Sequence, residues 1–403
     1  MSRPMTFRPA GASTTALART PVGRRALVRG AALLVPSLGG GAACASKAAD
    51  RRKRRRGDGL RDRIHETVTA ELPKGPGVTV LAARGSELLY GAGFGLADRA
   101  HRTRCARETV YDIASNTKQF TAAAVLKLEA QGRLGVDDRI GDLLPGLPPD
   151  KRPLTVHQLL THTSGLPEFL PDRYGDDYAK LSRAQLVAAT AHTRLHSRPG
   201  RTFRYSNLGY SLLAAIVEVR SGLSYERYLA RHLLGPARLD RTGHVLPRWR
   251  TSDIAVEYDE RGRPAGRPNT HPWAPDGPYW NLRGNGGLLS TAEDLFRWHL
   301  ALRGDDVLPA AARRKLFARH VSEKGDEGPA YGYGWALGRG AGGHPVASHT
   351  GQSQIGGSYS EIARSVDGGA FACVATNFST KKDGWELVDH GLARRLVDLI
   401  RTS

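Results

Sequence analysis

The chain has 403 residues, and 40% of its side chains are hydrophobic. That length suffices for two lobes that share a large core, and the 47 glycines and 23 prolines indicate a globular protein. No run of 18 apolar residues occurs, which excludes a membrane-spanning helix of the usual kind. The formal net charge of +20 is concentrated at the start, because residues 1–56 hold 13 Lys and Arg against one acid, Asp50.

The first 45 residues have the features of an export signal. Arg24-Arg25 is followed by a soft apolar stretch from Ala31 to Ala43 and by small residues around Cys44. This order is similar to a twin-arginine signal, although Gly23 stands where such signals often have Ser or Thr. We expect export to the cell envelope or beyond it. A flexible basic extension is the alternative, and a lipoprotein at Cys44 is a weaker one, because the aliphatic residue expected three positions earlier is missing.

Residues 46–57 form a basic linker that contains the run Arg51-Arg52-Lys53-Arg54-Arg55-Arg56. Six positive charges without interleaved aromatic residues bind polyanions by counterion release but do not read bases. We therefore expect no sequence-specific nucleic-acid binding, and we favour contact of Arg51 to Arg56 with a cell wall or a membrane surface.

Three cysteines are too few for a disulfide framework. Removal of the leader would leave Cys105 and Cys373, which are either one disulfide in an oxidising compartment or two buried free thiols. The sequence leaves both readings open.

From residue 58 onward the periodicity predicts strands near both ends and helices between them. The expected helices are Leu60–Leu72, Ser115–Gln131, Thr155–Thr163, Ser206–Arg220, Ser224–Leu234, a helix opened by the capping box Ser290-Thr291-Ala292-Glu293, and Gly384–Ile400. The expected strands are Gly77–Ala83, Glu87–Leu96, Tyr331–Leu337, Val346–Thr350, Ser353–Ile362 and Ala370–Thr376. This order predicts one domain over residues 58–403, with a mixed lobe (about 58–114 and 325–403) and an inserted helical lobe (about 115–324).

Several common catalytic patterns are missing from the chain. It has no Gly-x-Ser-x-Gly elbow, no His-Glu-x-x-His pair and no P-loop. His192 and His196 are four residues apart, but no acidic partner accompanies them. We therefore expect neither a metal ion nor a cofactor.

The strongest chemical signal is Ser115-Asn116-Thr117-Lys118 at the start of a predicted helix. Helix positions three apart share a face, so Lys118 is expected beside the Ser115 hydroxyl. A serine hydroxyl needs a neighbouring base, and a lysine whose pKa is lowered by burial can act as one. The spacing alone is weak evidence, because Ser379-Thr380-Lys381-Lys382 repeats it in a polar stretch.

Two further motifs follow in order. Tyr205-Ser206-Asn207 lies before a predicted helix, and His349-Thr350-Gly351 lies at the end of a predicted strand. With Ser115 to Lys118, they resemble the motifs of the serine β-lactamase and penicillin-recognising D-alanyl-D-alanine peptidase family. The resemblance covers about residues 60–400 and is closest to the branch of class C β-lactamases, serine carboxypeptidases and esterases. Residues 159–166 (Leu-Leu-Thr-His-Thr-Ser-Gly-Leu) and 284–290 (Gly-Asn-Gly-Gly-Leu-Leu-Ser) also fit that branch.

This resemblance implies an α+β fold of the D,D-peptidase/β-lactamase type, in which terminal helices flank an antiparallel sheet and an all-helical lobe is inserted. It implies that Ser115 forms an acyl-enzyme and that Lys118 and Tyr205 share the proton transfers, with Tyr205 as phenolate or as a relay to the leaving group. Asn207 would hold the substrate amide and orient Lys118. The backbone N–H groups of Ser115 and Gln352 would form the oxyanion hole.

One departure from the family pattern concerns the third motif, His349-Thr350-Gly351. The best-known β-lactamases have Lys-Thr-Gly there, and the lysine meets a substrate carboxylate. Histidine is largely neutral at pH 7, so His349 would be a weaker, pH-dependent donor. The substitution favours a D,D-carboxypeptidase or an esterase over a β-lactamase.

The sequence thus predicts a monomeric, exported serine hydrolase whose substrate is a small molecule or a peptidoglycan stem peptide, with D-alanyl-D-alanine carboxypeptidase activity first and esterase or β-lactamase activity as alternatives. A non-catalytic wall-binding protein is a further alternative, against which Ser115, Lys118 and Tyr205 argue together.

Overall fold

The computed structural model describes residues 59–72, 77–171, 176–322, 328–353, 357–378 and 391–403. The predicted leader, the basic linker, Ser379 and the first part of the predicted closing helix lie outside these residues. The α-helices, after a first one over residues 59–71, are α2 (Thr117–Ala130), α3 (Ile140–Leu143), α4 (Val156–Leu160), α5 (Arg183–Thr190), α6 (Asn207–Ser221), α7 (Tyr225–Leu229), α8 (Ala292–Ala301), α9 (Ala310–Leu316) and α11 (Leu392–Arg401).

Short helical turns and strands complete the fold. The 3₁₀ turns are η1 (Ala114–Asn116), η4 (Thr251–Asp253), η5 (Pro268–Thr270) and η6 (Ala341–Gly343), and η3 (Ala230–Leu234) is a π-helical turn. The strands are β1 (Val78–Arg84), β2 (Glu87–Phe94), β3 (Leu96–Asp98), β4 (Thr103–Arg104), β5 (Tyr111–Asp112), β6 (Glu257–Tyr258), β7 (Pro264–Gly266), β8 (Leu289–Ser290), β9 (Val321–Ser322), β10 (Ala330–Tyr331), β11 (Ala336–Arg339), β12 (Pro345–Gln352), β13 (Tyr359–Ser365) and β14 (Ala370–Thr376).

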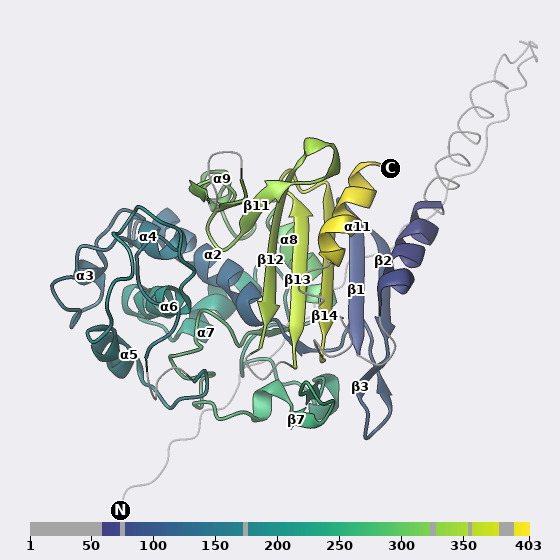
Figure 1. Ribbon diagram of the computed structural model, residues 1–403, viewed down its shortest axis with the longest axis horizontal. Helices are drawn as coiled ribbons and strands as arrows, with labels where there is room; N and C mark the ends of the chain where they lie inside the picture. The colour runs from purple at the N-terminus through teal and green to yellow at the C-terminus, as the bar shows by residue number, and fades with distance from the viewer. Residues whose placement is uncertain (1–58, 73–76, 172–175, 323–327, 354–356, 379–390) are drawn as a thin grey trace, which may run out of the picture. The chain divides into compact units, whose positions relative to one another are not determined.

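Eight strands form one antiparallel sheet in the order β2-β1-β14-β13-β12-β11-β10-β9 (Figure 1). Strand β1, from the start of the described chain, pairs directly with β14 near its end, with Val80 opposite Val374. The sheet therefore joins the two ends of the described chain, while helices α2 to α7 come from the sequence between them. The predicted class, mixed helices with an antiparallel sheet, is confirmed. The inserted lobe is not all-helical as predicted, because the short strands β6, β7 and β8 lie within residues 115–324.

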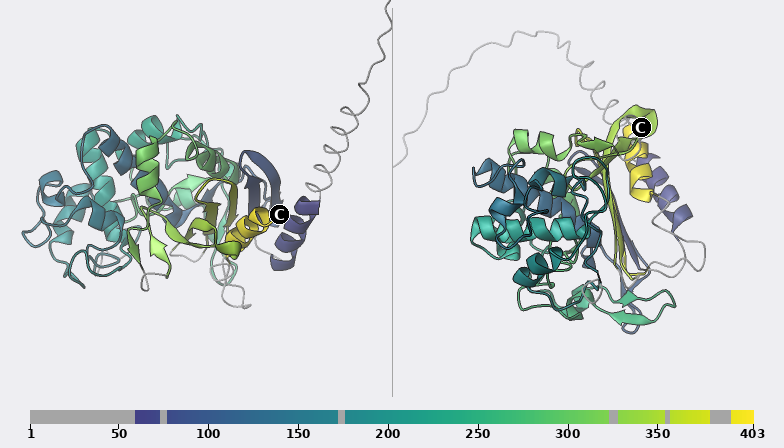
Figure 2. Two further views of the ribbon diagram at one scale, coloured as in Figure 1. Left: turned by 90° about the horizontal axis from the view of Figure 1, so that it is seen from above. Right: turned by 60° about the vertical axis from the view of Figure 1, so that its left-hand side comes forward.

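The central strands are covered on both faces, as Figure 2 shows. Side chains alternate between the faces, because a strand has a period of two. In β1, Val80 joins a core with the helix at residues 59–71 and with α11, whereas Leu81 joins the core that contains α2 and α8. In β14, Val374 joins the core with α11, and its neighbour Cys373 joins the core with α2 and α8. Burial on both faces explains why β14 is a continuous run of apolar and small residues.

Three predicted elements differ from the structure. The strand expected over Ser353–Ile362 is β13, which spans Tyr359–Ser365. The single strand expected from Tyr331 to Leu337 is a hairpin, because Gly334 adopts a φ of +74° and the N–H of Gly332 donates to the Trp335 carbonyl at 2.8 Å. The capping box expected at Ser290 is also shifted, since Thr291 accepts the N–H of Asp294 and Ser290 belongs to β8.

Of the two interpretations of the cysteines, the structure shows two free thiols rather than a disulfide. Cys105 and Cys373 are both free and buried. Burial raises the pKa of the Cys105 thiol to about 11 and that of Cys373 further, so both behave as small apolar residues. Among the described helices, none is long and apolar enough to cross a bilayer.

Candidate active site

Ser115 lies in a strained turn between the sheet and helix α2, rather than on the helix itself as predicted. It is the middle residue of η1, and the preceding Ala114 has a φ of +44°, which is unusual for a residue with a side chain. The Oδ1 atom of Asp112 accepts the Ala114 N–H at 2.7 Å and holds this turn. The turn therefore presents the Ser115 side chain at the start of α2.

A polar network fastens the same turn to strand β13. The Asn116 side chain donates to Ser360 Oγ at 2.8 Å, and Ser360 Oγ donates to the Ile113 carbonyl at 2.8 Å. The Gln119 side chain in turn donates to Asn116 Oδ1 at 2.8 Å. Asn116, Gln119 and Ser360 are fully buried, so these bonds keep the nucleophile in register with the sheet.

Lys118 is fully buried and its ammonium nitrogen has three oxygen partners. Nζ lies 3.0 Å from Ser115 Oγ, 2.7 Å from Asn207 Oδ1 and 2.8 Å from the Asn285 carbonyl. Burial lowers the pKa of Lys118 to about 7, although the negative charges of Asp177 and Glu168 oppose that shift. Lys118 thus lies beside Ser115 and has a lowered pKa, and its role as the base stays a prediction.

Tyr205 lies just before α6, with its ring 4.8 Å from Lys118 Nζ. Burial raises the pKa of Tyr205 well above its usual value, and only a hydrogen bond with Ser115 counters that effect. The phenol is therefore neutral at neutral pH. Between the two roles left open by the sequence, this environment favours a proton relay over a phenolate.

The His162 ring packs against the Tyr205 ring. Its ring lies 4.4 Å from the Tyr205 ring, and its Nδ1 accepts the Ser206 N–H at 3.0 Å. His162 is fully buried with a φ of +58°, and burial keeps its pKa well below the usual value. The sequence had singled out residues 159–166 by resemblance but had given His162 no role.

Asn207 is the first residue of α6, and Ser206 is the N-cap, because Ser206 Oγ accepts the Gly209 N–H. Asn207 therefore lies within the helix and is not its N-cap. The Asn285 carbonyl, from the 284–290 segment that also had no assigned role, is the third partner of Lys118. The Asn285 side chain donates to Ser211 Oγ at 2.8 Å and so fixes that carbonyl.

His349 differs from the substrate donor that the sequence predicted. Its Nδ1 lies 2.6 Å from the Thr350 carbonyl, which can only accept, so Nδ1 carries the proton. Its Nε2 therefore accepts from the Tyr331 hydroxyl at 2.9 Å. Burial, assisted by the positive charge of Lys118, lowers the pKa of His349 to about 3. The ring is thus neutral with both nitrogens occupied, and it positions Tyr331 and the strand instead of offering a charge.

The rest of the third motif lies where the sequence placed it. Thr350 and Gln352 are exposed near the end of β12, and Gly351 packs directly on the nucleophile turn. A Cβ at Gly351 would come within 2.4 Å of the Ile113 carbonyl and 2.9 Å of the Ser115 nitrogen. Only glycine lets β12 approach Ser115 this closely, which brings the Ser115 N–H beside the strand that carries Gln352.

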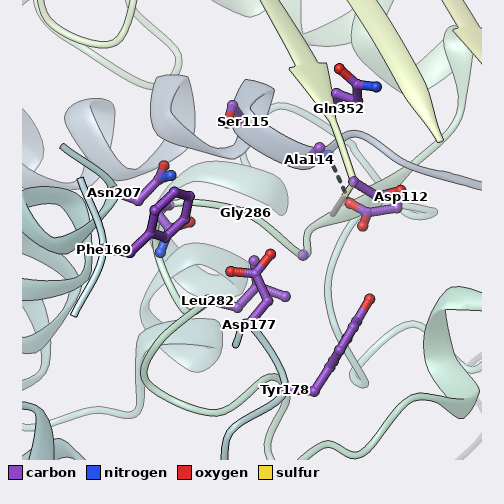
Figure 3. A pocket seen from close by; sticks show the side chains of 13 residues that line it. Asp112, Ala114, Ser115, Phe169, Asp177, Tyr178, Asn207, Leu282, Gly286 and Gln352 are labelled. Atoms are coloured by element: carbon purple, nitrogen blue, oxygen red, sulfur yellow. Dashed lines mark hydrogen bonds between the residues drawn. The ribbon is translucent and has the colours of Figure 1, made fainter. Parts of the chain in front are cut away.

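Two cavities flank the nucleophile. Ser115, Asn207 and Gln352 line one of about 50 Å³, together with Asp112 and Asp177 (Figure 3). The other, of about 420 Å³, lies on the Tyr205 side and is lined by Phe203, Tyr205, Tyr331, Ala336, Ser348, His349, Thr350, Glu361, Gly391 and Arg394. The sequence had given Asp112, Asp177 and Arg394 no role. Asp112 is only three residues before Ser115, whereas Asp177 and Arg394 are distant from all three motifs along the chain.

Clusters of metal-ligating side chains do not occur in the part of the chain that the structure describes. No group of three or more His, Cys, Asp or Glu side chains there could hold a metal ion. His192 and His196 are both exposed.

A serine activated by a buried lysine, on a turn between an antiparallel sheet and a helical lobe, defines a class of acyl-transferring serine hydrolases. The chain belongs to the Beta-lactamase family, whose family model matches residues 65–389.

Individual relatives agree with this assignment. Penicillin-binding protein 4* of Bacillus subtilis is 31% identical over 283 residues, which are 68% of this chain and 62% of that protein. Protein flp of Staphylococcus aureus strain MW2 is 28% identical over 58% of this chain. The chain thus spans about half to three fifths of the length of these curated relatives, 47% in the case of flp.

The fold recurs in solved structures. An octameric penicillin-binding protein homologue from Pyrococcus abyssi aligns with a TM-score of 0.67 and 26% identity, over 86% of this chain and 76% of that one. EstCE1, described as a hydrolase with promiscuous acyltransferase activity, aligns with a TM-score of 0.66 over 87% of this chain and all of its own. At 22% identity, the likeness to EstCE1 shows the fold alone.

Proposed function

We propose that this protein hydrolyses amide or ester bonds through an acyl-serine intermediate at Ser115. The observation that carries this proposal is the set of partners around Lys118. Two of them, Asn207 Oδ1 and the Asn285 carbonyl, can only accept hydrogen bonds. A neutral amine has two N–H groups for these two oxygens, so its lone pair faces the one partner that can donate, the Ser115 hydroxyl.

The reaction follows from that arrangement. Lys118 takes the hydroxyl proton as Ser115 Oγ attacks the carbonyl carbon, and the N–H groups of Ser115 and Gln352 receive the developing oxyanion, each worth about 3 kcal/mol. Tyr205, a neutral phenol within reach of Ser115, passes a proton to the leaving group as the bond to that group breaks, and it takes in return the proton that Lys118 received from Ser115. Water then attacks the acyl-serine, and Ser115 regains its proton.

For the substrate, we propose D-alanyl-D-alanine carboxypeptidase chemistry first. A leaving group with a carboxylate needs a cation, and His349 supplies none. Arg394 is an exposed arginine on the wall of the larger cavity, which it shares with Tyr205 and Thr350. It offers the charge that the third motif lacks.

Esterase activity is the second candidate. The neutral His349 leaves the third motif uncharged, which suits a leaving group without a carboxylate. Arg394→Ala distinguishes the two: we expect it to raise KM for D-alanyl-D-alanine by about tenfold or more and to change KM for a neutral ester by less than about twofold.

Intact mass after incubation with a penicillin tests the proposal. A persistent adduct on the wild type, absent from Ser115→Ala, supports the acyl-serine and a D,D-peptidase-like site. Consumption of the drug without an adduct indicates β-lactamase activity. An untouched drug directs attention to esters, and absence of ester hydrolysis as well would leave the non-catalytic wall-binding alternative.

A further inference from the structure

A cavity of about 400 Å³ lies between the end of helix α8, helix α9 and the turn that joins β13 to β14. Among the described residues, four arginines and a single acid line it: Arg303, Arg313, Arg314, Arg364 and Asp367. None of them lines either cavity beside the nucleophile. The proposed hydrolysis therefore leaves this cavity without a role.

Arg364 is the buried member of this group. It belongs to β13, is 1% exposed, and its guanidinium lies 4.9 Å from the centre of the Phe317 ring. Its Nε and Nη1 atoms donate to the carbonyls of Ser365 and His299, each at 3.5 Å, and it forms no ion pair with the residues that the structure describes. Hydrogen bonds of that length are weak. A buried positive charge with five N–H groups is thus held without a counter-charge.

Two of the other arginines also lack an acidic partner. Arg303 and Arg314 are exposed, and their side chains form no hydrogen bond or ion pair with the described part of the chain. Asp367, the acid on the wall, is already engaged, because it accepts from Ser365 Oγ at 2.6 Å and pairs with Arg401 at 3.1 Å. The wall of the cavity therefore does not balance its own positive charge.

A purely structural explanation accounts for only part of this group. Arg303 follows the end of α8, and Arg313 and Arg314 lie in the last turn of α9, where a positive side chain stabilises the helix dipole. Arg364 lies on a strand and has no such reason to be there. Burial and Arg303 lower the pKa of Arg364 to about 9, against the opposing effect of Asp367. Arg364 thus stays charged at pH 7 among charges of the same sign, and an anion in the cavity would relieve that repulsion.

We propose that this cavity binds the phosphate group of a phosphate monoester. Guanidinium groups bind phosphate oxygens through paired N–H donors, and a monoester, whose second pKa is about 6, carries close to two negative charges at pH 7.5. Three arginines without an acidic partner suit a dianion better than the single charge of a carboxylate. Leu302, Phe317 and Val366 form an apolar part of the wall, on which the organic group of the ester packs. This site is independent of acyl transfer at Ser115.

Calorimetric titration of the full chain with phenyl phosphate at pH 7.5 tests the proposal. Phenyl sulfate has nearly the same shape and only one negative charge, so it is the matched probe. We expect phenyl phosphate to bind at least about tenfold more tightly than phenyl sulfate. No binding of phenyl phosphate, or equal affinities for the two esters, would overturn the proposal.

Three variants locate the site. Arg364→Met and Arg303→Gln should each weaken phenyl phosphate binding by about tenfold or more. Because Arg303 is exposed, its variant tests the site even if Arg364→Met does not fold. Arg227→Gln is the control, since Arg227 is an exposed arginine in the last turn of α7 and is absent from the cavity wall, and its dissociation constant should stay within about twofold. Equal losses in all three variants would indicate a general effect of net charge and would contradict the site.

Thermal unfolding separates a binding role of Arg364 from a structural one. Without phosphate, Arg364→Met should unfold at the wild-type temperature or above it, because an apolar side chain replaces a buried charge that has no counter-charge. Phenyl phosphate should raise the midpoint of the wild type but not that of the variant. A lower midpoint without phosphate, together with unchanged affinity, would make Arg364 a structural residue. Loss of binding in Arg394→Ala alone would place the anion in the larger cavity beside Tyr205, and either result overturns the proposal.

Two further probes identify the source of the phosphate group. Inorganic phosphate should bind more weakly than phenyl phosphate, and equal affinities would show that the apolar wall recognises no ester group. Vesicles of phosphatidylcholine that contain phosphatidate, a lipid with a phosphate monoester headgroup, distinguish a lipid ligand from a soluble one. Sedimentation with these vesicles that Arg364→Met abolishes supports a lipid ligand. Sedimentation that is absent, or equal for both chains, supports a soluble ester.

Discussion

Two lysines of this protein are equally buried, yet their surroundings differ. Lys151, in the segment before α4, is 1% exposed, and its Nζ pairs with Asp150 Oδ2 at 2.7 Å and with the Thr193 carbonyl at 2.5 Å. Lys118 is 0% exposed and has only the neutral oxygens of Ser115, Asn207 and Asn285 as direct partners among the described residues. One lysine is buried with a counter-charge and the other without.

The difference shows how the same side chain becomes structural or reactive. A carboxylate at hydrogen-bond distance offsets the cost of burying an ammonium, so Lys151 ties two segments together. Neutral acceptors orient Lys118 without offsetting that cost, and its pKa falls to about 7. Burial alone therefore does not make a base, since the kind of partner decides. Four experiments test this contrast.

The largest effect is expected at the nucleophile. Ser115→Ala should lower kcat/KM by about 10⁴-fold or more, because no acyl-enzyme can form. Steady-state hydrolysis of a small ester measures it. Ser379→Ala repeats the change at the second Ser-x-x-Lys spacing and should have no effect, and equal losses at both serines would contradict the assignment.

The two lysines should then separate activity from stability. Lys118→Met should cost about 10³-fold or more in kcat/KM, since Ser115 loses its base. Lys151→Met should leave kcat/KM within about twofold but lower the free energy of unfolding by about 1–3 kcal/mol, because the buried Thr193 carbonyl loses its donor. Denaturant unfolding of both variants provides the comparison. A large loss of turnover in Lys151→Met would remove the contrast.

Gly351→Ala is expected to cost about 10²-fold in kcat without touching Lys118. A methyl group there collides with the Ile113 carbonyl and displaces the Ser115 N–H from its place beside β12. The pH profile of the variant should retain its midpoint, because the base is intact. A shifted midpoint would show that the strand also sets the environment of Lys118.

The smallest effect concerns pH. The pKa of Lys118 is lowered, and its neutral form is the active one, so kcat/KM should fall about tenfold per pH unit below about 7 and level off above it. A pH series on a neutral ester measures this, with Lys151→Met as the control that keeps the same profile. An acid limb that is absent, or one centred near the ordinary value for lysine, would refute Lys118 as the base.

Local patterns in the sequence predicted much of this site. The three-residue spacing of Ser115 and Lys118, the position of Tyr205 and Asn207 at the start of a helix, and the glycine at 351 all lie where the motifs implied. The helix at residues 59–71 and strands β1, β2, β12 and β14 also follow from periodicity and from glycine or proline stops. Such features depend on contacts between near neighbours in the chain.

The predictions that failed depended on distant contacts. His349 lost its expected role because Tyr331, 18 residues away, occupies its Nε2. Asp112 of β5 and Asp177 of the helical lobe line the same cavity although 65 residues separate them along the chain (Figure 3). Spacing along the chain carries no signal for such pairs.

The sequence by itself determined which residues could act, since a hydroxyl, an amine and a phenol at these spacings allow acyl transfer. The tertiary structure alone decided the charge that each one carries. Lys118 has a lowered pKa because the fold removes water and places no carboxylate among its direct hydrogen-bond partners in the described residues, and His349 is neutral because the fold buries its ring. Desolvation depends on every element packed around a group, and no local pattern encodes that sum.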